Sequence, residues 1–116
     1  MANKEALKLL KKQDVDAFNK WVKLRRNKGK KAIDLNDQNL SGLELHWVDL
    51  KDAHLNGCDL RNSDLKGANL KRARLRQADL RGANFTEANL TEADLRRAKL
   101  KGVDLARAIL KKTKGI

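Results

Sequence analysis

The stretch 68-ANLKRARLRQADLRGANF-85 repeats every five residues, with leucine or phenylalanine at positions 70, 75, 80 and 85 and alanine two places before each. The register continues unbroken from residue 33 to residue 112, which makes 16 units. If the central residue of a unit is written i, position i is leucine in 15 units and phenylalanine at 85. Position i−2 is alanine in nine units, and position i−1 is aspartate or asparagine in 11.

Neither regular secondary structure has a period of five. On an α-helix, five residues advance about 500°, so successive leucines would drift by roughly 140° around the helix. On a flat strand, an odd period would place successive leucines on opposite faces. Within one unit, however, i−2 and i share a side, as residues two apart on a strand do. A short extended piece and a turn, repeated at constant length, therefore predict a solenoid with i−2 and i inside.

The corners of such a coil and the units themselves point to a known family. Five of the seven glycines, at positions 42, 57, 67, 82 and 102, fall at i+2, where a corner favours a residue without a Cβ atom. The units 78-ADLRG, 83-ANFTE, 88-ANLTE and 93-ADLRR match the consensus A-(D/N)-L-x-x. On these residues the run resembles the pentapeptide-repeat family, over about two thirds of the chain.

The resemblance implies an all-β solenoid, a right-handed quadrilateral β-helix with four units in each coil. The 16 units would then form about four coils, at 33–52, 53–72, 73–92 and 93–112. At the usual spacing of strands they would make a rod of about 19 Å. We expect three parts in the chain: a helical N-terminal cap at 1–32, the β-helix at 33–112 and a short C-terminal tail at 113–116.

Residues 1–32 lie outside the register and predict two helices. Apolar residues at 6, 7, 9 and 10 favour a helix over 3–13, and Asp14 is the expected N-cap of a second helix that runs to about Arg26. The segment 9-LLKKQDVDAFNKWVK-23 resembles the helical leader of some bacterial members of the family. Because a bare solenoid end exposes unpaired strand edges, we expect the helices to cap the first coil, with Phe18 and Trp21 over it.

The first coil departs from alanine at position i−2. Its residues there, all larger than alanine, are Ile33, Gln38, Leu43 and Val48. These larger side chains indicate an interior that is completed by another element. A buried amide needs hydrogen-bond partners, so we expect Gln38 near the end of the coil, where backbone groups are still unpaired.

Charge is concentrated at the two ends of the chain, whose formal net charge is +12. Residues 1–32 hold 11 Lys and Arg against three Asp and Glu, residues 33–92 hold eight against ten, and residues 93–116 hold eight against two. One interpretation is a polyanion site, such as one for nucleic acid. Its candidate contacts are Lys23, Arg25, Arg26, Lys28, Lys30 and Lys31. We favour the other interpretation, in which these cations form the solvated face of a cap and discourage stacking of rods.

No pattern in the sequence indicates catalysis, a cofactor or a metal. The single cysteine, Cys58, falls at i−2 and is expected to be a small core residue. His46 and His54 fall on different sides of different coils, and no carboxylates converge with them. Some members of the family are acidic rods that mimic DNA and inhibit topoisomerases. The basic ends of this chain argue against that function.

These observations predict a non-enzymatic structural or protein-interaction scaffold with an unknown protein partner. The candidate partner contacts are His46 and Trp47, which point outward from the first coil. A basic module that binds nucleic acid or another polyanion is the alternative. The only apolar run near the start, around Leu7, contains charges and predicts neither a signal peptide nor a membrane span. We therefore expect a bacterial, cytoplasmic protein.

The last coil is expected to present open strand edges, which invite pairing. Because the N-terminal cap blocks head-to-tail stacking, such pairing would join two C-terminal ends. The excess of cations in residues 93–116 opposes this contact and is screened over about 8 Å at physiological salt. We expect a monomer, or a weak C-terminal end-to-end dimer as salt rises.

Overall fold

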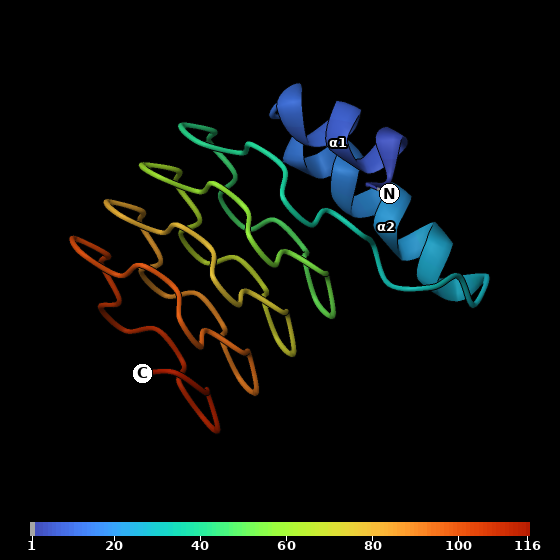
Figure 1. Ribbon diagram of the computed structural model, residues 1–116. Helices are drawn as coiled ribbons and strands as arrows, with labels where there is room; N and C mark the ends of the chain where they lie inside the picture. The colour runs from blue at the N-terminus through green and yellow to red at the C-terminus, as the bar shows by residue number, and fades with distance from the viewer. Residues whose placement is uncertain (1) are drawn as a thin grey trace.

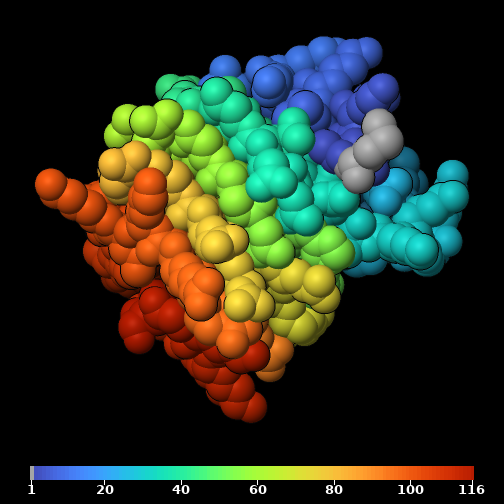
Figure 2. Space-filling model, in the orientation of Figure 1, coloured from blue at the N-terminus to red at the C-terminus, as the bar shows by residue number. Residues whose placement is uncertain are grey.

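The computed structural model describes residues 2–116 and consists of two helices followed by a solenoid. The helices are α1 (Lys4–Lys11) and α2 (Val15–Asn27), and Figure 1 shows them across the end of the solenoid from which the coils begin. Successive coils then stack away from the helices, and the C-terminus lies at the far end (Figure 1). Figure 2 shows the coils as adjacent bands in chain order.

Each helix begins at a side chain that accepts a backbone N–H. Asn3 Oδ1 accepts the N–H of Ala6 at 3.0 Å, and Asp14 Oδ1 accepts that of Ala17 at 3.1 Å. These contacts satisfy N–H groups that have no partner inside a helix. The N-cap predicted at Asp14 is confirmed, and α2 ends one residue beyond the predicted boundary.

The solenoid is held by parallel backbone pairing between residues 20 apart. The bridges run from Asp34 with His54 to Asp94 with Lys114. Every bridge residue up to Ile109 is at position i−1, and Lys114 continues the same spacing beyond residue 112. Two hydrogen bonds show the pattern: Leu35 N–H donates to His54 O at 2.8 Å, and His54 N–H donates to Ile33 O at 2.9 Å. Each extended piece contributes a single bridge residue, so residues 2–116 contain no longer strand.

Every corner of the solenoid has left-handed backbone at position i+2. All 16 of these residues have positive φ, and only five of them are glycine. The other 11 include Trp47, with φ 63°, and Arg97, also with φ 63°. Glycine therefore marks only five of these corners in the sequence. The constant length of the unit imposes the same turn on the other residue types.

The core is a set of columns of leucine and alanine along the axis. Leucines at position i are fully buried through the third coil, and Phe85 takes the same place in its unit. Burial declines in the last coil, where Leu110 is 38% exposed. On the cap side, Phe18 and Val22 are buried in the same cluster as Ile33, and Trp21 is partly buried against it. The helices therefore close the first coil.

Side chains of the cap take the place of a preceding coil. Asn19 Oδ1 accepts the N–H of Asp49 at 2.8 Å, and Asn19 Nδ2 donates to Trp47 O at 3.1 Å. Gln13 Oε1 accepts the N–H of Glu44 at 2.7 Å. Gln38 lies at this same end, where its Nε2 donates to Asn36 O at 3.2 Å, as expected. The edge of the first coil is therefore paired by amide side chains.

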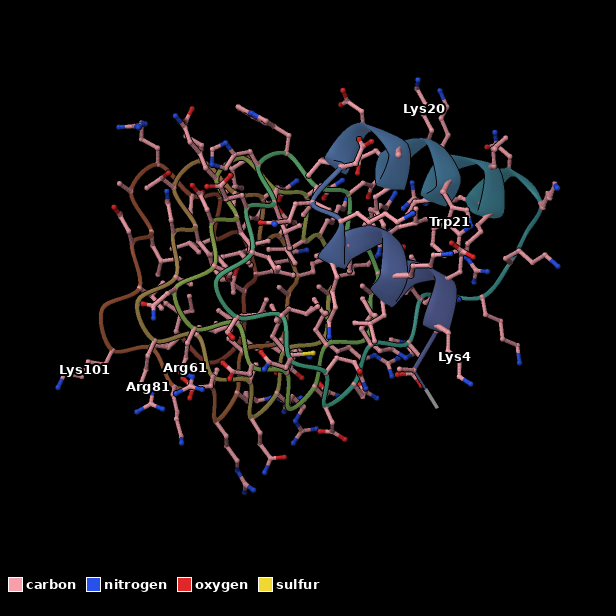
Figure 3. The ribbon with its side chains drawn as sticks, turned by 90° about the horizontal axis from the view of Figure 1, so that it is seen from above. Lys4, Lys20, Trp21, Arg61, Arg81 and Lys101 are labelled. Atoms are coloured by element: carbon pink, nitrogen blue, oxygen red, sulfur yellow. The ribbon has the colours of Figure 1, made fainter. Side chains whose placement is uncertain are left out.

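Replacing Asn19 by alanine is expected to lower the free energy of unfolding by about 1–3 kcal/mol. The reason is that a backbone N–H and a C=O at the edge of the first coil lose their partners together. Lys20→Ala is the matched control, since Lys20 projects from the adjacent position into solvent (Figure 3). Urea denaturation of both variants measures the difference, and equal midpoints would contradict a structural role for the Asn19 amide.

Candidate interaction surfaces

The i−1 aspartates and asparagines bond to the backbone of their own turns. Asn84 Oδ1, for example, accepts the N–H of Thr86 at 2.9 Å. In three units an arginine at i+1 adds a second contact, and Arg81 Nη2 donates to Asp79 Oδ2 at 2.6 Å. This hydrogen bond lowers the pKa of Asp79 to about 2. The i−1 column is therefore structural, and the three aspartates that have an arginine at i+1 are paired with it.

Cations also form a column on one face. Figure 3 shows Arg61, Arg81 and Lys101 side by side at the edge of the rod, from positions 20 residues apart. Asp59 holds the guanidinium of Arg61 at 2.7 Å, as Asp79 holds that of Arg81. The two arginines are therefore paired within the protein and carry little net charge toward a ligand.

The structure brings together four of the six predicted polyanion contacts. Arg25, Arg26, Lys30 and Lys31 line a cavity of about 280 Å³ between the end of α2 and the first coil. The other two, Lys23 and Lys28, are exposed outside this cavity.

Arg25 and Arg26 are held in place by different contacts. The guanidinium of Arg25 lies 5.1 Å from the centre of the Trp21 ring, and its Nη2 donates to Lys31 O at 3.0 Å. Arg26 Nη1 donates to Asp49 Oδ2 at 2.9 Å, and this hydrogen bond raises the pKa of Arg26. The stacking of Arg25 on Trp21 could have been expected from their spacing of four residues on one helix.

The two predicted partner contacts lie on a different corner. Trp47 is 59% exposed, and its ring lies over Gly67, where an added Cβ would come within 2.3 Å of the ring. His46 Nε2 contacts Asp64 Oδ2 of the next coil. The indole is therefore an exposed apolar surface at a fixed place, with a histidine–carboxylate pair beside it.

A third surface was missed by the sequence analysis. A cavity of about 630 Å³ lies over the second to fourth coils. Its charged lining residues are Arg72, Arg74, Arg76, Glu92, Asp94, Lys112 and Lys114. The signal in the sequence is Arg74, which stands at i−1 where most units have aspartate or asparagine. Residues 20 apart, such as Arg74 and Lys114, could have been stacked from the four-unit coil.

The described residues contain no evident chemical centre. Cys58 is buried, its thiol donates to Leu35 O at 2.9 Å, and burial raises its pKa to about 11. Within residues 2–116, no three His, Cys, Asp or Glu side chains are grouped to hold a metal ion. Over the same range, no helix has the length and apolar character needed to cross a membrane.

Comparisons with solved structures show similar repeat proteins. A pentapeptide repeat protein from the cyanobacterium Cyanothece 51142 is 38% identical over 72% of this chain and 60% of that chain, with a TM-score of 0.47. One of Nostoc Pcc 7120 is 36% identical over 65% of this chain and 62% of that chain, with a TM-score of 0.47. A third protein, from the thylakoid lumen of Arabidopsis thaliana, is 32% identical over 69% of this chain and 59% of that chain, with a TM-score of 0.40.

The chain spans about three fifths of the length of these proteins. No curated protein matches it. The family model described as "Pentapeptide repeats" matches in eight copies, at residues 32–67, 44–82, 68–106 and 78–114. These matches cover well over half of the chain, and the protein therefore belongs to the pentapeptide-repeat family of right-handed β-helix solenoids.

Proposed function

We propose that this protein is a non-catalytic scaffold that holds a protein partner at the corner that carries Trp47. The observation that carries the proposal is the indole itself, which is 59% exposed on left-handed backbone with φ 63°. A large aromatic side chain that is exposed at a fixed place points to a use outside the fold.

The backbone that carries the indole is held before any partner arrives. The backbone N–H of Trp47 donates to Lys66 O at 2.9 Å, and the backbone O of Trp47 accepts from Asn19 Nδ2 of α2. Gly67 leaves the space that the ring occupies. An anchor that is already ordered loses little conformational entropy on binding, which favours affinity.

Charged groups follow the indole along the same corner of the solenoid. Lys66 Nζ lies 3.6 Å from Glu87 Oε2, and Arg107 Nη2 lies 3.6 Å from the same oxygen. With the His46–Asp64 pair, they give this corner one apolar ring and several polar side chains. An aromatic centre with a polar rim is the usual composition of a protein–protein contact.

The test is affinity capture from a lysate of the native host, followed by measurement of Kd for the purified partner. Trp47→Ala is expected to weaken binding at least about 30-fold, which corresponds to an aromatic hot spot of about 2 kcal/mol. Leu24→Ala is the matched control, because Leu24 is 60% exposed but lies on α2. Its Kd should stay within about twofold of wild type.

Two glycine substitutions test whether the position of the Trp47 ring matters for binding. Gly67→Ala places a methyl group 2.3 Å from the indole, whereas Gly42→Ala meets no atom within 4 Å. Both glycines have left-handed backbone, with φ +66° and +69°, so alanine introduces a similar backbone strain at either position. Only Gly67→Ala should weaken binding. Wild-type affinity in both Trp47→Ala and Gly67→Ala would refute the proposed contact.

A further inference from the structure

Two of the cavities lie along the same corner of the solenoid. Asp52 lines the smaller cavity beside α2, and Arg72, Glu92 and Lys112 line the larger one. These four residues are 20 apart and stack along the axis, and Arg72 Nε donates to Asp52 Oδ1 at 2.8 Å across the junction. We call this surface the cationic corner. Its cations are Arg25, Arg26, Lys30, Lys31, Lys51, Arg72, Arg74, Arg76, Lys112 and Lys114.

The cationic corner has a large excess of positive charge. Its ten cations face three carboxylates, those of Asp52, Glu92 and Asp94. Asp94 is already held by Arg96, with Nη2 to Oδ2 at 2.7 Å, and this contact lowers its pKa to about 2. Only three of the ten cations form an ion pair within residues 2–116. Arg25 is held by Trp21 and by Lys31 O, and the other six are available to an external anion.

The diagonally opposite corner is less basic. Its column at i−1 consists of Glu44, Asp64, Asn84 and Asp104, and three of its four i+2 residues are glycine. No lysine or arginine occurs at either position of that corner. Arg61, Arg81 and Lys101 lie beside that corner at i+1, and Asp59 and Asp79 pair the two arginines. The rod is therefore more basic on one side than on the other, and an approaching polyanion is steered to the cationic corner.

The chemistry of the cationic corner favours a phosphate backbone over other anions. A peptide that binds at an open strand edge or in apolar pockets would not fit here, because the side chains are mainly charged, and an acidic peptide is the competing ligand. Single-stranded nucleic acid needs exposed aromatic rings on which bases stack. The one aromatic residue near this surface, Trp21, is covered by the guanidinium of Arg25. A duplex needs only a row of cations that follows its phosphates.

We propose that the cationic corner binds the sugar–phosphate backbone of duplex nucleic acid, without reading its sequence. The larger cavity and the cap place cations along the full stack of coils, which is about 19 Å at the usual strand spacing. Duplex DNA carries one phosphate of each strand per about 3.4 Å of axis, so this length spans about five phosphates of one strand. Because the strand winds around the axis, five is the upper limit for contact with one corner, and it sets a maximum slope of about −4.5 in log K against log salt.

The experiment is fluorescence anisotropy of the whole chain with a 20-base-pair duplex of arbitrary sequence, as DNA and as RNA, across a salt series. The test variant is Arg74→Glu with Lys114→Glu, and the control is Lys99→Glu with Lys101→Glu. Each variant replaces two cations by glutamate, and each replacement lowers the net charge by two. Both variants therefore have a net charge of +8 instead of +12. Lys99 stacks on Asp79 as Lys114 stacks on Asp94, which matches the structural cost. Thermal unfolding of both variants verifies that they fold.

The test variant is expected to bind at least about tenfold more weakly than wild type, with a salt slope smaller by about two. The control should lose less than about threefold, and Trp47→Ala should bind duplex like wild type, which separates this site from the proposed protein contact. Equal losses in the two charge variants would overturn the proposal in favour of unspecific attraction. Tighter binding to poly-glutamate than to the duplex would assign the corner to an acidic protein, and no binding at low salt would reject it.

Discussion

Substitution of Leu75 by aspartate is expected to prevent folding, whereas Arg76→Asp at the next position should be well tolerated. Leu75 is fully buried, and its N–H donates to Asp94 O at 2.8 Å between coils on both sides. Losing a buried leucine costs about 1.5–3 kcal/mol, and an unpaired carboxylate in its place costs several more. The sum approaches the total stability of about 5–15 kcal/mol that is usual for a domain.

Arg76 provides the control because its side chain points outward. Its ion-pair contact, with Asp94, is long at 4.0 Å. Surface pairs of this kind contribute about 0–1 kcal/mol, so Arg76→Asp should shift the unfolding midpoint only slightly. Thermal unfolding followed by circular dichroism distinguishes the variants. Similar midpoints for the two would be incompatible with the five-residue register.

Deletion of residues 1–28 is the second change with a large expected effect, and the remaining fragment should aggregate. The deletion removes both helices and exposes Ile33 and the edge of the first coil. It also removes Asn19 and Gln13, which pair the N–H groups of that edge. An open strand edge beside apolar surface is a site of aggregation. Light scattering and size-exclusion chromatography of the fragment measure this outcome.

Two full-length variants test the same idea without a deletion. Phe18→Ala should destabilise the protein by about 3–5 kcal/mol, since Phe18 is fully buried in the core cluster. Lys20→Ala should stay within about 0.5 kcal/mol of wild type. If the fragment from residue 29 were soluble, monomeric and rich in β-structure, the helices would not be needed as a cap, and a recognition role for them would gain support.

The repeat could be predicted from the sequence because its determinants are local. The spacing of leucine and alanine determines which side chains point inward, and the N-cap at Asp14 depends on three neighbouring residues. The left-handed backbone at Trp47 is less evident, because no glycine marks it. It follows from the constant length of the unit, which requires the same turn at every corner.

The surfaces were harder to predict because they depend on how the cap docks. The rotation of α2 on the first coil decides that Arg25 and Arg26 line the cavity and that Lys23 does not. The same docking brings Asn19 to Asp49, 30 residues away in the chain. No local pattern contains this information. The column of Arg74 and Lys114 follows from the repeat, but its continuity with the cap requires the docked helices.

The pairing of residues 20 apart gives interior and exterior different tolerances to changes in length. An insertion or deletion of five residues leaves every leucine inside, yet it turns all later units by one side of the coil. The column through Arg72 and Lys112 would then be broken, although the core would be intact. Only a change of 20 residues preserves both. During the evolution of such a solenoid, duplication of single units would therefore diversify the surface, and duplication of whole coils would lengthen the same surface.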